Sequence, residues 1–323
     1  LHRGKESLTL NLKSIEGAKI FQQLVRNSDI VIENFRPQVK YKLGLDYDTL
    51  CDINPAIILA SISGFGQDGP YKDRPGFDQV AQGMSGLMSI TGEPGAGPMR
   101  VGIPLADLSA GLFAAQGILL ALYERMSSGK GQWVQTSLLQ SQIFMLDFQA
   151  ARYAMNGEIP EQAGNNHPTS IPTGVFKTKD GFINIAASGE AIWQKLAIAL
   201  GHAEWISEPE FSTAQARSQN RSKLGDKIDE CTKTKSTSDW IAILNDEGVP
   251  CGPIYSIDEM FADPQIRHLQ ISQSVINSQS TEIPVLTQPL SLSRTPSTLD
   301  KAAPLIGEHT DKILNELGYK QSE

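Results

Sequence analysis

A single carboxylate, Asp107, lies where an extended apolar run gives way to a helical pattern. Residues 99–106 predict a strand, and the small and apolar residues of 108–122 predict a buried helix. An aspartate at such a junction is most often an N-cap, which accepts a hydrogen bond from an amide of the first helical turn. It can instead be a catalytic carboxylate. Taken alone, the residue leaves both roles open.

A second group of polar side chains follows the strand predicted at residues 30–33. Asn34 offers a donor and an acceptor, Phe35 a flat stacking face, and Arg36 a positive charge for a phosphate. In open α/β sheets, ligands bind beyond the carboxyl ends of the strands. A capped loop with a solvated arginine explains the same residues equally well.

A glycine-spaced loop, residues 64–71, follows the strand predicted at 57–63. It does not match a phosphate-binding loop, because neither G-x-x-x-x-G-K-[ST] nor a helix-opening G-x-G-x-x-G is present. Gly64 and Gly66 would let the backbone approach a ligand closely. A turn that only needs glycine accounts for them as well.

Other stretches carry weaker chemical signals. Phe77 and Asp78 precede a helix and turn predicted over residues 79–92, and Asp78 is a candidate N-cap there. A Gly-x-Ser-x-Gly nucleophile elbow is absent from the sequence. The histidines show no paired ligand spacing, so no metal site is predicted; they are His2, His167, His202, His268 and His309.

The elements that must position these side chains alternate between strands and helices over residues 1–174. Strands are predicted at 7–12, 30–33, 57–63 and 134–139, and helices at 15–26 and 47–53. This alternation predicts a Rossmann-like α/β domain with a mainly parallel sheet covered by helices. Because the sequence starts in a loop before a strand, we expect that a preceding βα unit is missing.

Two further segments complete the predicted organisation. After a connector at 156–174 rich in Gly, Pro and Asn, residues 175–267 predict a smaller α+β domain, with a strand at 181–187 and a helix at 191–200. Residues 268–323 predict a return segment that packs on the large domain; it has short antiparallel strands within 272–292 and a helix at 312–317.

Composition limits the classes of function. The 323 residues carry a net charge of −8 and a pI near 5.2, which argues against a nucleic-acid partner or an anionic membrane surface. The 3 cysteines are odd in number and lack C-x-x-C spacing, so no disulfide framework is expected. No apolar run is expected to reach the about 18 residues that span a bilayer. We therefore expect a cytoplasmic protein.

Together these stretches resemble the class III CoA-transferases, the family of formyl-CoA and carnitine CoA-transferases that also contains the α-methylacyl-CoA racemases. The similar segments follow the family order from end to end; they are residues 3–13, 33–37, 63–71, 76–78, 106–111, 129–132 and 303–310. The resemblance implies a CoA- and acyl-CoA-using transferase with no permanently bound cofactor.

The resemblance gives Asp107 a role as the covalent nucleophile. A carboxylate there would attack an acyl-CoA thioester, form a mixed anhydride, and then become an aspartyl-CoA thioester that an incoming carboxylic acid resolves. The backbone amides at the start of the following helix are expected to stabilise the developing oxyanion. By the same resemblance, the residues expected to contact CoA are Leu10, Lys13, Asn34, Phe35, Val39 and Lys42.

Two differences from the family pattern bear on the predicted reaction and substrate. The racemase branch has an acid/base histidine before the acidic residue of Gly-His-Asp, whereas this chain has Phe77, which carries no proton. The glycine-rich loop of formyl-CoA transferase has no match, because residues 165–171 read Asn-Asn-His-Pro-Thr-Ser-Ile. Gly64, Gly66, Phe77, Asp78 and His167 are expected to line the substrate pocket.

The predicted activity is transfer of CoA from an acyl-CoA donor to a free carboxylic acid. An acyl-CoA racemase or epimerase is the first alternative, and a non-catalytic CoA-binding subunit of a hetero-oligomer is the second. The resemblance also implies an interlocked homodimer in which each chain threads its partner.

Overall fold

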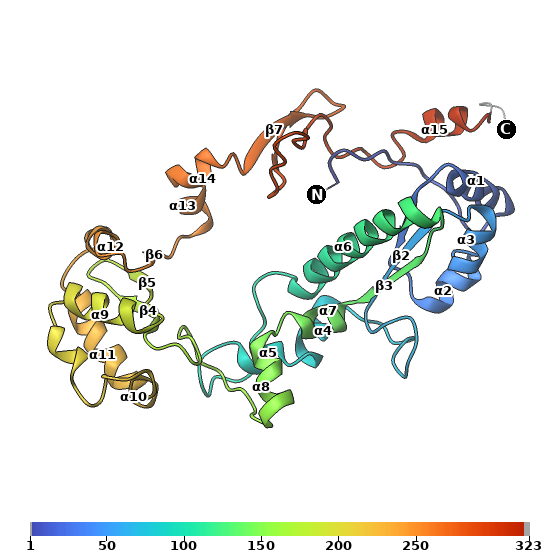
Figure 1. Cartoon of the computed structure of the whole chain (residues 1–323). Helices are drawn as coiled ribbons and strands as arrows, with labels where there is room; N and C mark the ends of the chain where they lie inside the picture. The colour runs from blue at the N-terminus through green and yellow to red at the C-terminus, as the bar shows by residue number, and fades with distance from the viewer. Residues whose placement is uncertain (1, 320–323) are drawn as a thin grey trace. The chain divides into compact units, whose positions relative to one another are not determined.

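The computed structural model describes residues 2–319, and Figure 1 shows their helices and strands. Contacts divide the chain into two compact units. The first contains Leu1–Arg74, Leu112–Thr136 and Ser256–Glu323, and the second contains Pro75–Gly111 and Ser137–Tyr255. The division predicted at residues 174 and 267 stays a prediction. The ends of the first and last predicted segments, residues 1 and 320–323, lie outside the described residues.

A three-stranded sheet forms the centre of the first unit. Its order is β1 (Ile30–Glu33), β2 (Ile58–Ser63) and β3 (Trp133–Ser137). β1 and β2 run parallel, with Ile30 opposite Ile58. The apolar strands predicted at these positions are confirmed, and so is a mixed α/β fold with a parallel pair.

Three helices accompany these strands in sequence: α1 (Ile15–Arg26), α2 (Pro37–Lys42) and α3 (Tyr47–Ile53). The side chains of Ser14 and Asp46 cap α1 and α3, each accepting a hydrogen bond from an amide of the first turn. The bounds of α1 and α3 agree with the prediction. Apolar side chains from α1, α3, β2 and the residue directly before β2 pack together in the core of this unit; they are Val25, Leu50, Ile57 and Leu59.

Helix α6 (Leu105–Ser128) is 24 residues long. Within residues 2–319 it is the one helix long and apolar enough to cross a membrane, with a mean hydropathy of 1.7 over 18 residues. The prediction that no apolar run reaches this length is therefore wrong. This match rests on length and composition only. The core helix of a soluble protein meets the same criteria. The cytoplasmic location stays a prediction, as does the absence of a membrane or nucleic-acid partner.

One side of α6 approaches β3, and another carries uncovered apolar side chains. A Cβ atom placed on Gly117 would lie 2.6 Å from Cγ1 of Val134, so glycine allows the helix to approach the strand closely (Figure 1). The large apolar residues exposed along the same stretch are Leu112, Leu119, Leu120, Tyr123 and Met126.

Two predicted strands are absent from the described structure. Residues 7–12 form no strand, because the backbone N–H groups of Ser7 and Thr9 donate to the side chains of His309 and Thr310. Residues 99–104 form a loop that leads into α6, and residues 105 and 106 already belong to that helix. The buried side chain of Gln82 provides the hydrogen bonds that a neighbouring strand would otherwise make there.

The second unit contains a set of short helices and an antiparallel sheet. The helices that precede the sheet in sequence are α4 (Asp78–Met84), α5 (Leu87–Ile90), α7 (Leu138–Phe144) and α8 (Phe148–Asn156). The sheet has the order β4 (Thr173–Lys177), β5 (Phe182–Ala186) and β6 (Cys251–Pro253), with antiparallel pairing throughout. The strand predicted at 181–187 corresponds to β5.

Helices in the same unit complete the core around this sheet. They are α9 (Glu190–Ala199), the 3-10 helix η1 (Ala203–Ile206), α10 (Ala214–Gln219), α11 (Arg221–Thr232) and α12 (Thr237–Asp246). Trp193, Leu196, Phe211 and Leu224 are buried together with Ile183 of β5. This arrangement confirms the α+β character predicted for the stretch.

The C-terminal part belongs to the first unit and ends beside its N-terminal segment. Its elements are α13 (Ile257–Ala262), α14 (Pro264–His268), the antiparallel pair β7 (Ser272–Ile276) and β8 (Glu282–Leu286), and α15 (Thr310–Glu316). The backbone N–H of His309 donates to the carbonyl of Ser7 at 2.9 Å, so segments from both ends of the chain lie side by side (Figure 1).

Gly131 provides a test of the packing before β3. A Cβ atom at this residue would lie 1.8 Å from the carbonyl oxygen of Ile57, which is backbone and cannot rotate away. We expect Gly131→Ala to destabilise the protein by about 3 kcal/mol or more in urea unfolding. As a control, Gly225→Ala on α11 meets nothing within 4 Å and should stabilise by about 0.5–1 kcal/mol. Equal stability of the two variants would contradict this packing.

Candidate active site

Asp107 lies in the first turn of α6, as the third helical residue after Leu105 and Ala106. Its side chain is exposed. Among residues 2–319, no group donates a hydrogen bond to its carboxylate; its backbone N–H donates to the side chain of Asp78. Asp107 is therefore not the N-cap of this helix, and its carboxylate is available for another role.

Asp78 performs the capping instead. One of its oxygens, Oδ1, accepts hydrogen bonds from the backbone N–H groups of Ala106 at 2.8 Å and of Asp107 at 3.4 Å. The other, Oδ2, accepts a bond from Nε2 of Gln82 at 2.7 Å. The prediction that Asp78 caps its own helix is wrong, because Phe77 occupies the N-cap position of α4. Asp78 caps α6, a helix far away in sequence.

The position beside Asp78 has an electrostatic consequence for Asp107. The pKa of Asp107 is raised above its ordinary value, first because surrounding protein removes part of its water shell and second because Asp78 is negatively charged. A raised pKa means that the ionised form is less favourable than in water. A carboxylate with that property is a stronger base and a better nucleophile when it is ionised.

The amides at the start of α6 are all engaged within the chain. The N–H of Leu105 donates to the carbonyl of Ile103, and the N–H of Leu108 donates to the carbonyl of Pro104. Asp78 accepts from the two amides between them. Because these amides already have acceptors within the chain, their role in stabilising an oxyanion stays a prediction.

Three of the residues predicted to contact CoA line one cavity in the first unit. Lys13, Val39 and Lys42 surround a space of about 620 Å³, between the segment that leads into α1 and the helix α2. The other lining residues are Leu12, Ser14, Ile15, Ala18 and Leu43. Two positive charges at the edge of a partly apolar cavity suit a ligand that combines phosphates with an apolar or aromatic portion.

The remaining predicted CoA residues lie near this cavity in sequence but do not line it. Leu10 is half-buried before the loop that enters α1. Asn34 and Phe35 are exposed between β1 and α2. The carboxylate of Glu33 accepts the backbone N–H of Phe35 at 2.8 Å and thereby fixes the start of this loop.

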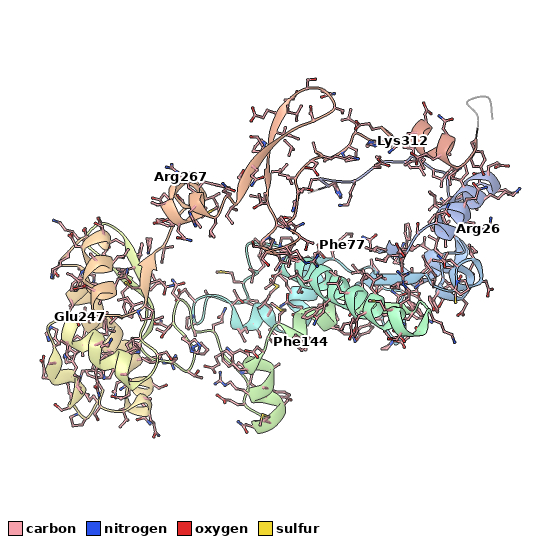
Figure 2. All side chains as sticks on the ribbon, turned by 45° about the horizontal axis from the view of Figure 1, so that its top comes forward. Arg26, Phe77, Phe144, Glu247, Arg267 and Lys312 are labelled. Atoms are coloured by element: carbon pink, nitrogen blue, oxygen red, sulfur yellow. The ribbon has the colours of Figure 1, made fainter. Side chains whose placement is uncertain are left out.

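The predicted substrate-pocket residues fall into both units. Gly64 and Gly66 follow β2, and Gly66 has a φ of +111°, a conformation that favours glycine. Phe77, labelled in Figure 2, is 75% exposed next to Asp78. No described cavity brings all of these residues together, and their role stays a prediction.

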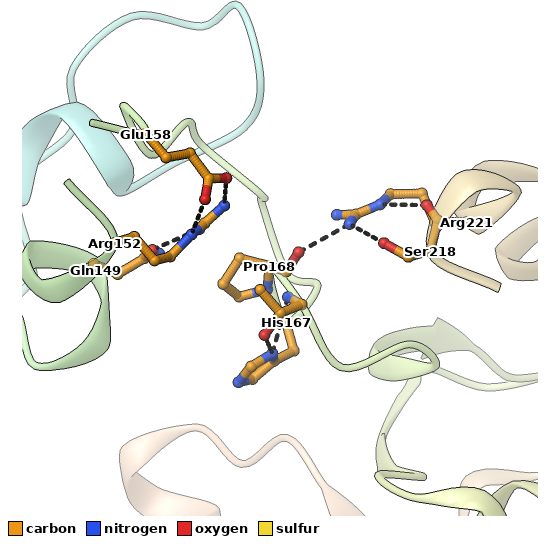
Figure 3. A network of polar contacts seen from close by, with 8 residues as sticks. Gln149, Arg152, Glu158, His167, Pro168, Ser218 and Arg221 are labelled. Carbon is orange, nitrogen blue, oxygen red and sulfur yellow. Dashed lines mark hydrogen bonds and ion pairs between the residues drawn. The ribbon is translucent and has the colours of Figure 1, made fainter. Parts of the chain in front are cut away.

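His167 organises the connector between α8 and β4 (Figure 3). Its Nδ1 accepts hydrogen bonds from the backbone N–H groups of Ser170 at 2.9 Å and Thr169 at 3.2 Å. Its ring stacks on Phe148, with centroids 5.7 Å apart. An Nδ1 that accepts from the backbone requires the hydrogen on Nε2, so His167 presents a fixed donor there.

Some functional candidates in the structure were absent from the sequence prediction. Gln82 is fully buried and holds the loop before α6, and Lys40 is fully buried in α2. The signal available was a polar residue within a short helix, which is too common to single out either position. Among the described residues, no cluster of three His, Cys, Asp or Glu side chains could hold a metal ion.

The sequence profile of CoA-transferase family III matches residues 1–310. The chain belongs to CoA-transferase family III. A succinate–glutarate CoA-transferase from Agrobacterium fabrum is 38% identical over 98% of this chain and 79% of its own length. A succinyl-CoA–D-citramalate CoA-transferase from Chloroflexus aurantiacus is 37% identical over 98% of this chain and 79% of its own length.

A solved structure supports the same assignment. A CaiB/BaiF family protein from Brucella suis superposes with a TM-score of 0.84 at 37% identity, over 98% of this chain and 82% of the other. The chain is therefore a CoA-transferase, which moves CoA between an acyl-CoA and a carboxylic acid, and the predicted class of enzyme is confirmed.

The electrostatic link between the two aspartates gives a testable pH dependence. Asp78→Asn removes the negative charge beside Asp107, so the pKa of Asp107 should fall and the acid limb of the CoA-transferase kcat/KM profile should move to lower pH. The variant should also lose about 1–3 kcal/mol of stability, because an amide cannot satisfy the Gln82 donor as a carboxylate does. Asp226→Asn, an exposed residue of α11, should leave the profile unchanged. An unshifted acid limb in Asp78→Asn would contradict the link.

Proposed function

We propose that this CoA-transferase works through covalent catalysis by Asp107. One oxygen of its carboxylate attacks the thioester carbonyl of the acyl-CoA donor, the C–S bond breaks, and CoA leaves as a thiolate. The product is a mixed anhydride between Asp107 and the donor acyl group. The thiolate then attacks the aspartyl carbonyl, which releases the donor as a free carboxylate and leaves an aspartyl-CoA thioester.

The second half of the reaction repeats these steps with the acceptor. The carboxylate of the acceptor acid attacks the aspartyl thioester and displaces the CoA thiolate, which gives a second mixed anhydride. The thiolate attacks the acyl carbonyl that came from the acceptor. The new acyl-CoA leaves, and Asp107 is regenerated as a carboxylate without net gain or loss of a proton.

The observation that carries this proposal is that Asp78, and not Asp107, caps α6. A buried carboxylate, Asp78, caps α6, so the exposed carboxylate of Asp107 has no structural duty among the described residues. An unengaged carboxylate at a helix start, with a raised pKa, fits a nucleophile better than a cap.

CoA binding in this proposal uses the cavity lined by Lys13, Val39 and Lys42. The two ammonium groups would face the phosphates, and the apolar side chains would contact the remainder of the nucleotide end. The exposed Phe35 offers its ring to adenine from the loop that follows β1.

The substrate class follows from the named relatives. The proteins from Agrobacterium fabrum and Chloroflexus aurantiacus are named for succinate or succinyl-CoA together with a second carboxylic acid. We therefore assign succinyl-CoA as the donor of this chain and a dicarboxylic acid of similar length as the acceptor. The two share a second carboxylate, for which the fixed Nε2–H of His167 is a suitable hydrogen-bond donor.

The assembly proposed for the active enzyme is a homodimer. The apolar side chains exposed along α6, including Leu112, Tyr123 and Met126, form a surface that a second copy would cover. The threaded, interlocked form of the dimer rests on the family resemblance. Light scattering on the purified chain should give twice the mass of 35.1 kDa, and a monodisperse monomer that transfers CoA would contradict the dimer.

Removal of the nucleophile is the direct test of the mechanism. Asp107→Asn should reduce CoA transfer by at least about a thousandfold, because an amide cannot form the anhydride. Its stability at neutral pH should not fall, because a group with a raised pKa stabilises the fold when protonated and loses that contribution as pH rises. Asp311→Asn, an exposed residue in the first turn of α15, is the matched control and should retain wild-type transfer. Substantial transfer by Asp107→Asn would exclude the nucleophilic role.

An acceptor screen tests the substrate class. With succinyl-CoA as the donor, glutarate and other dicarboxylic acids of four or five carbons should give the largest kcat/KM among the acids compared, and monocarboxylic acids of equal length should be poorer because they lack the second charge. Formation of each new acyl-CoA is measured by mass spectrometry. A preference for monocarboxylic acids would overturn the assignment while leaving the role of Asp107 intact.

A further inference from the structure

A fully buried lysine lies beneath the proposed nucleotide end of the CoA site. The ammonium of Lys40, in α2, is 2.6 Å from Oε1 of Gln67, 3.5 Å from Oε1 of Glu33 and 3.4 Å from Oγ of Ser61. The side chains of Lys40 and Glu33 are 0% and 2% exposed. All four residues belong to the first unit.

Aromatic packing encloses this group from another side. The ammonium lies 4.3 Å from the ring centroid of Trp133, whose indole N–H donates to Oγ of Ser61 at 2.9 Å. Burial lowers the pKa of Lys40, and the negative charge of Glu33 opposes that change. The charge is thus held by a specific set of partners from β1, β2, β3 and the loop after β2.

This cluster is costly for stability. Nε2 of Gln67 is buried without a hydrogen-bond partner among the described residues, and Oε1 of Glu33 has only the 3.5 Å ion pair with Lys40. A buried ion pair often contributes no more than apolar side chains of the same volume, so a methionine or leucine at residue 40 would pack as well. The arrangement therefore calls for an explanation other than core stability.

The partners of Lys40 connect it to two loops of the proposed site. Glu33 uses its second oxygen, Oε2, to hold the backbone N–H of Phe35. Gln67 belongs to the glycine-spaced loop that contains Gly64 and Gly66. One ammonium thus joins the Phe35 loop to the glycine loop.

The same lysine anchors the helix that forms one wall of the cavity. Val39, Lys42 and Leu43 line the cavity from one face of α2. Lys40 points from a different face of this six-residue helix into the core. A helix this short has little stability of its own, so its position depends on such anchors.

We propose that Lys40 is a positioning residue for the nucleotide end of CoA: it ties α2, which lines the cavity, to the Phe35 loop and the Gln67 loop, so that the three are held in one fixed arrangement. This inference rests on the proposed function, because that function places CoA there. A loop held in its bound conformation before the ligand arrives increases affinity by reducing the entropy cost of binding.

The test variant removes both charges of the Lys40–Glu33 ion pair, so that no unpaired charge stays buried. In Lys40→Met/Glu33→Gln, the glutamine can still accept the N–H of Phe35, but the bridge to Gln67 is lost. We expect KM for succinyl-CoA to rise about tenfold, with kcat and the melting temperature close to those of the wild type. Glu33→Gln alone keeps the bridge and should show a smaller rise. Lys19→Met, an exposed position on α1, should match the wild type.

A truncated donor distinguishes positioning from general damage. Succinyl-pantetheine lacks the nucleotide, so the double variant and the wild type should use it equally well. An equal rise in KM for both donors would show a structural defect and overturn the inference, and so would an unchanged KM for succinyl-CoA.

Calorimetric titration with CoA separates this inference from the proposed function. Weaker binding by the double variant than by the wild type supports the role of Lys40. If both bind CoA equally, the role of Lys40 is refuted and the CoA site stands. If the wild-type protein binds no CoA, the inference and the proposed function fail together.

Discussion

The carboxylate of Asp78 is the interaction on which the candidate active site depends. It is 8% exposed and accepts hydrogen bonds from two amides of α6 and from Gln82. A buried carboxylate costs free energy unless such donors surround it, so the cap, the loop before α6 and the start of the helix are stable only together. This mutual dependence fixes where Asp107 lies without using its side chain.

The prediction from sequence succeeded where local signals determine the structure. α1 and α3 have a capping side chain before an amphipathic segment, and β1 is a short apolar run between turns. It failed at residues 7–12 and 99–106, which have the composition of strands. Their backbone groups are satisfied by the side chains of distant residues, such as Gln82 and His309, and sequence pattern does not show which distant residue will reach them.

In the candidate site, too, some residues could be predicted from the sequence and others could not. Asp107 and the pair of lysines around the cavity could be named in advance, because a series of short segments resembles one enzyme family in order. Lys40 could not, because lysine is among the residues least often buried and its partners come from separate strands. The capping role of Asp78 was assigned to the wrong helix for a related reason: an N-cap is normally local, and this one is not.

The close approach of Gly131 to the carbonyl of Ile57 affects how missense variants of this enzyme are interpreted. In a screen scored by growth or by turnover, replacements of Gly131 and of Asp107 would both register as inactive. The first would deplete the folded protein, and the second would leave a normal amount of it. Abundance measured beside activity, for example by an epitope tag on the same library, separates lesions of folding from lesions of chemistry.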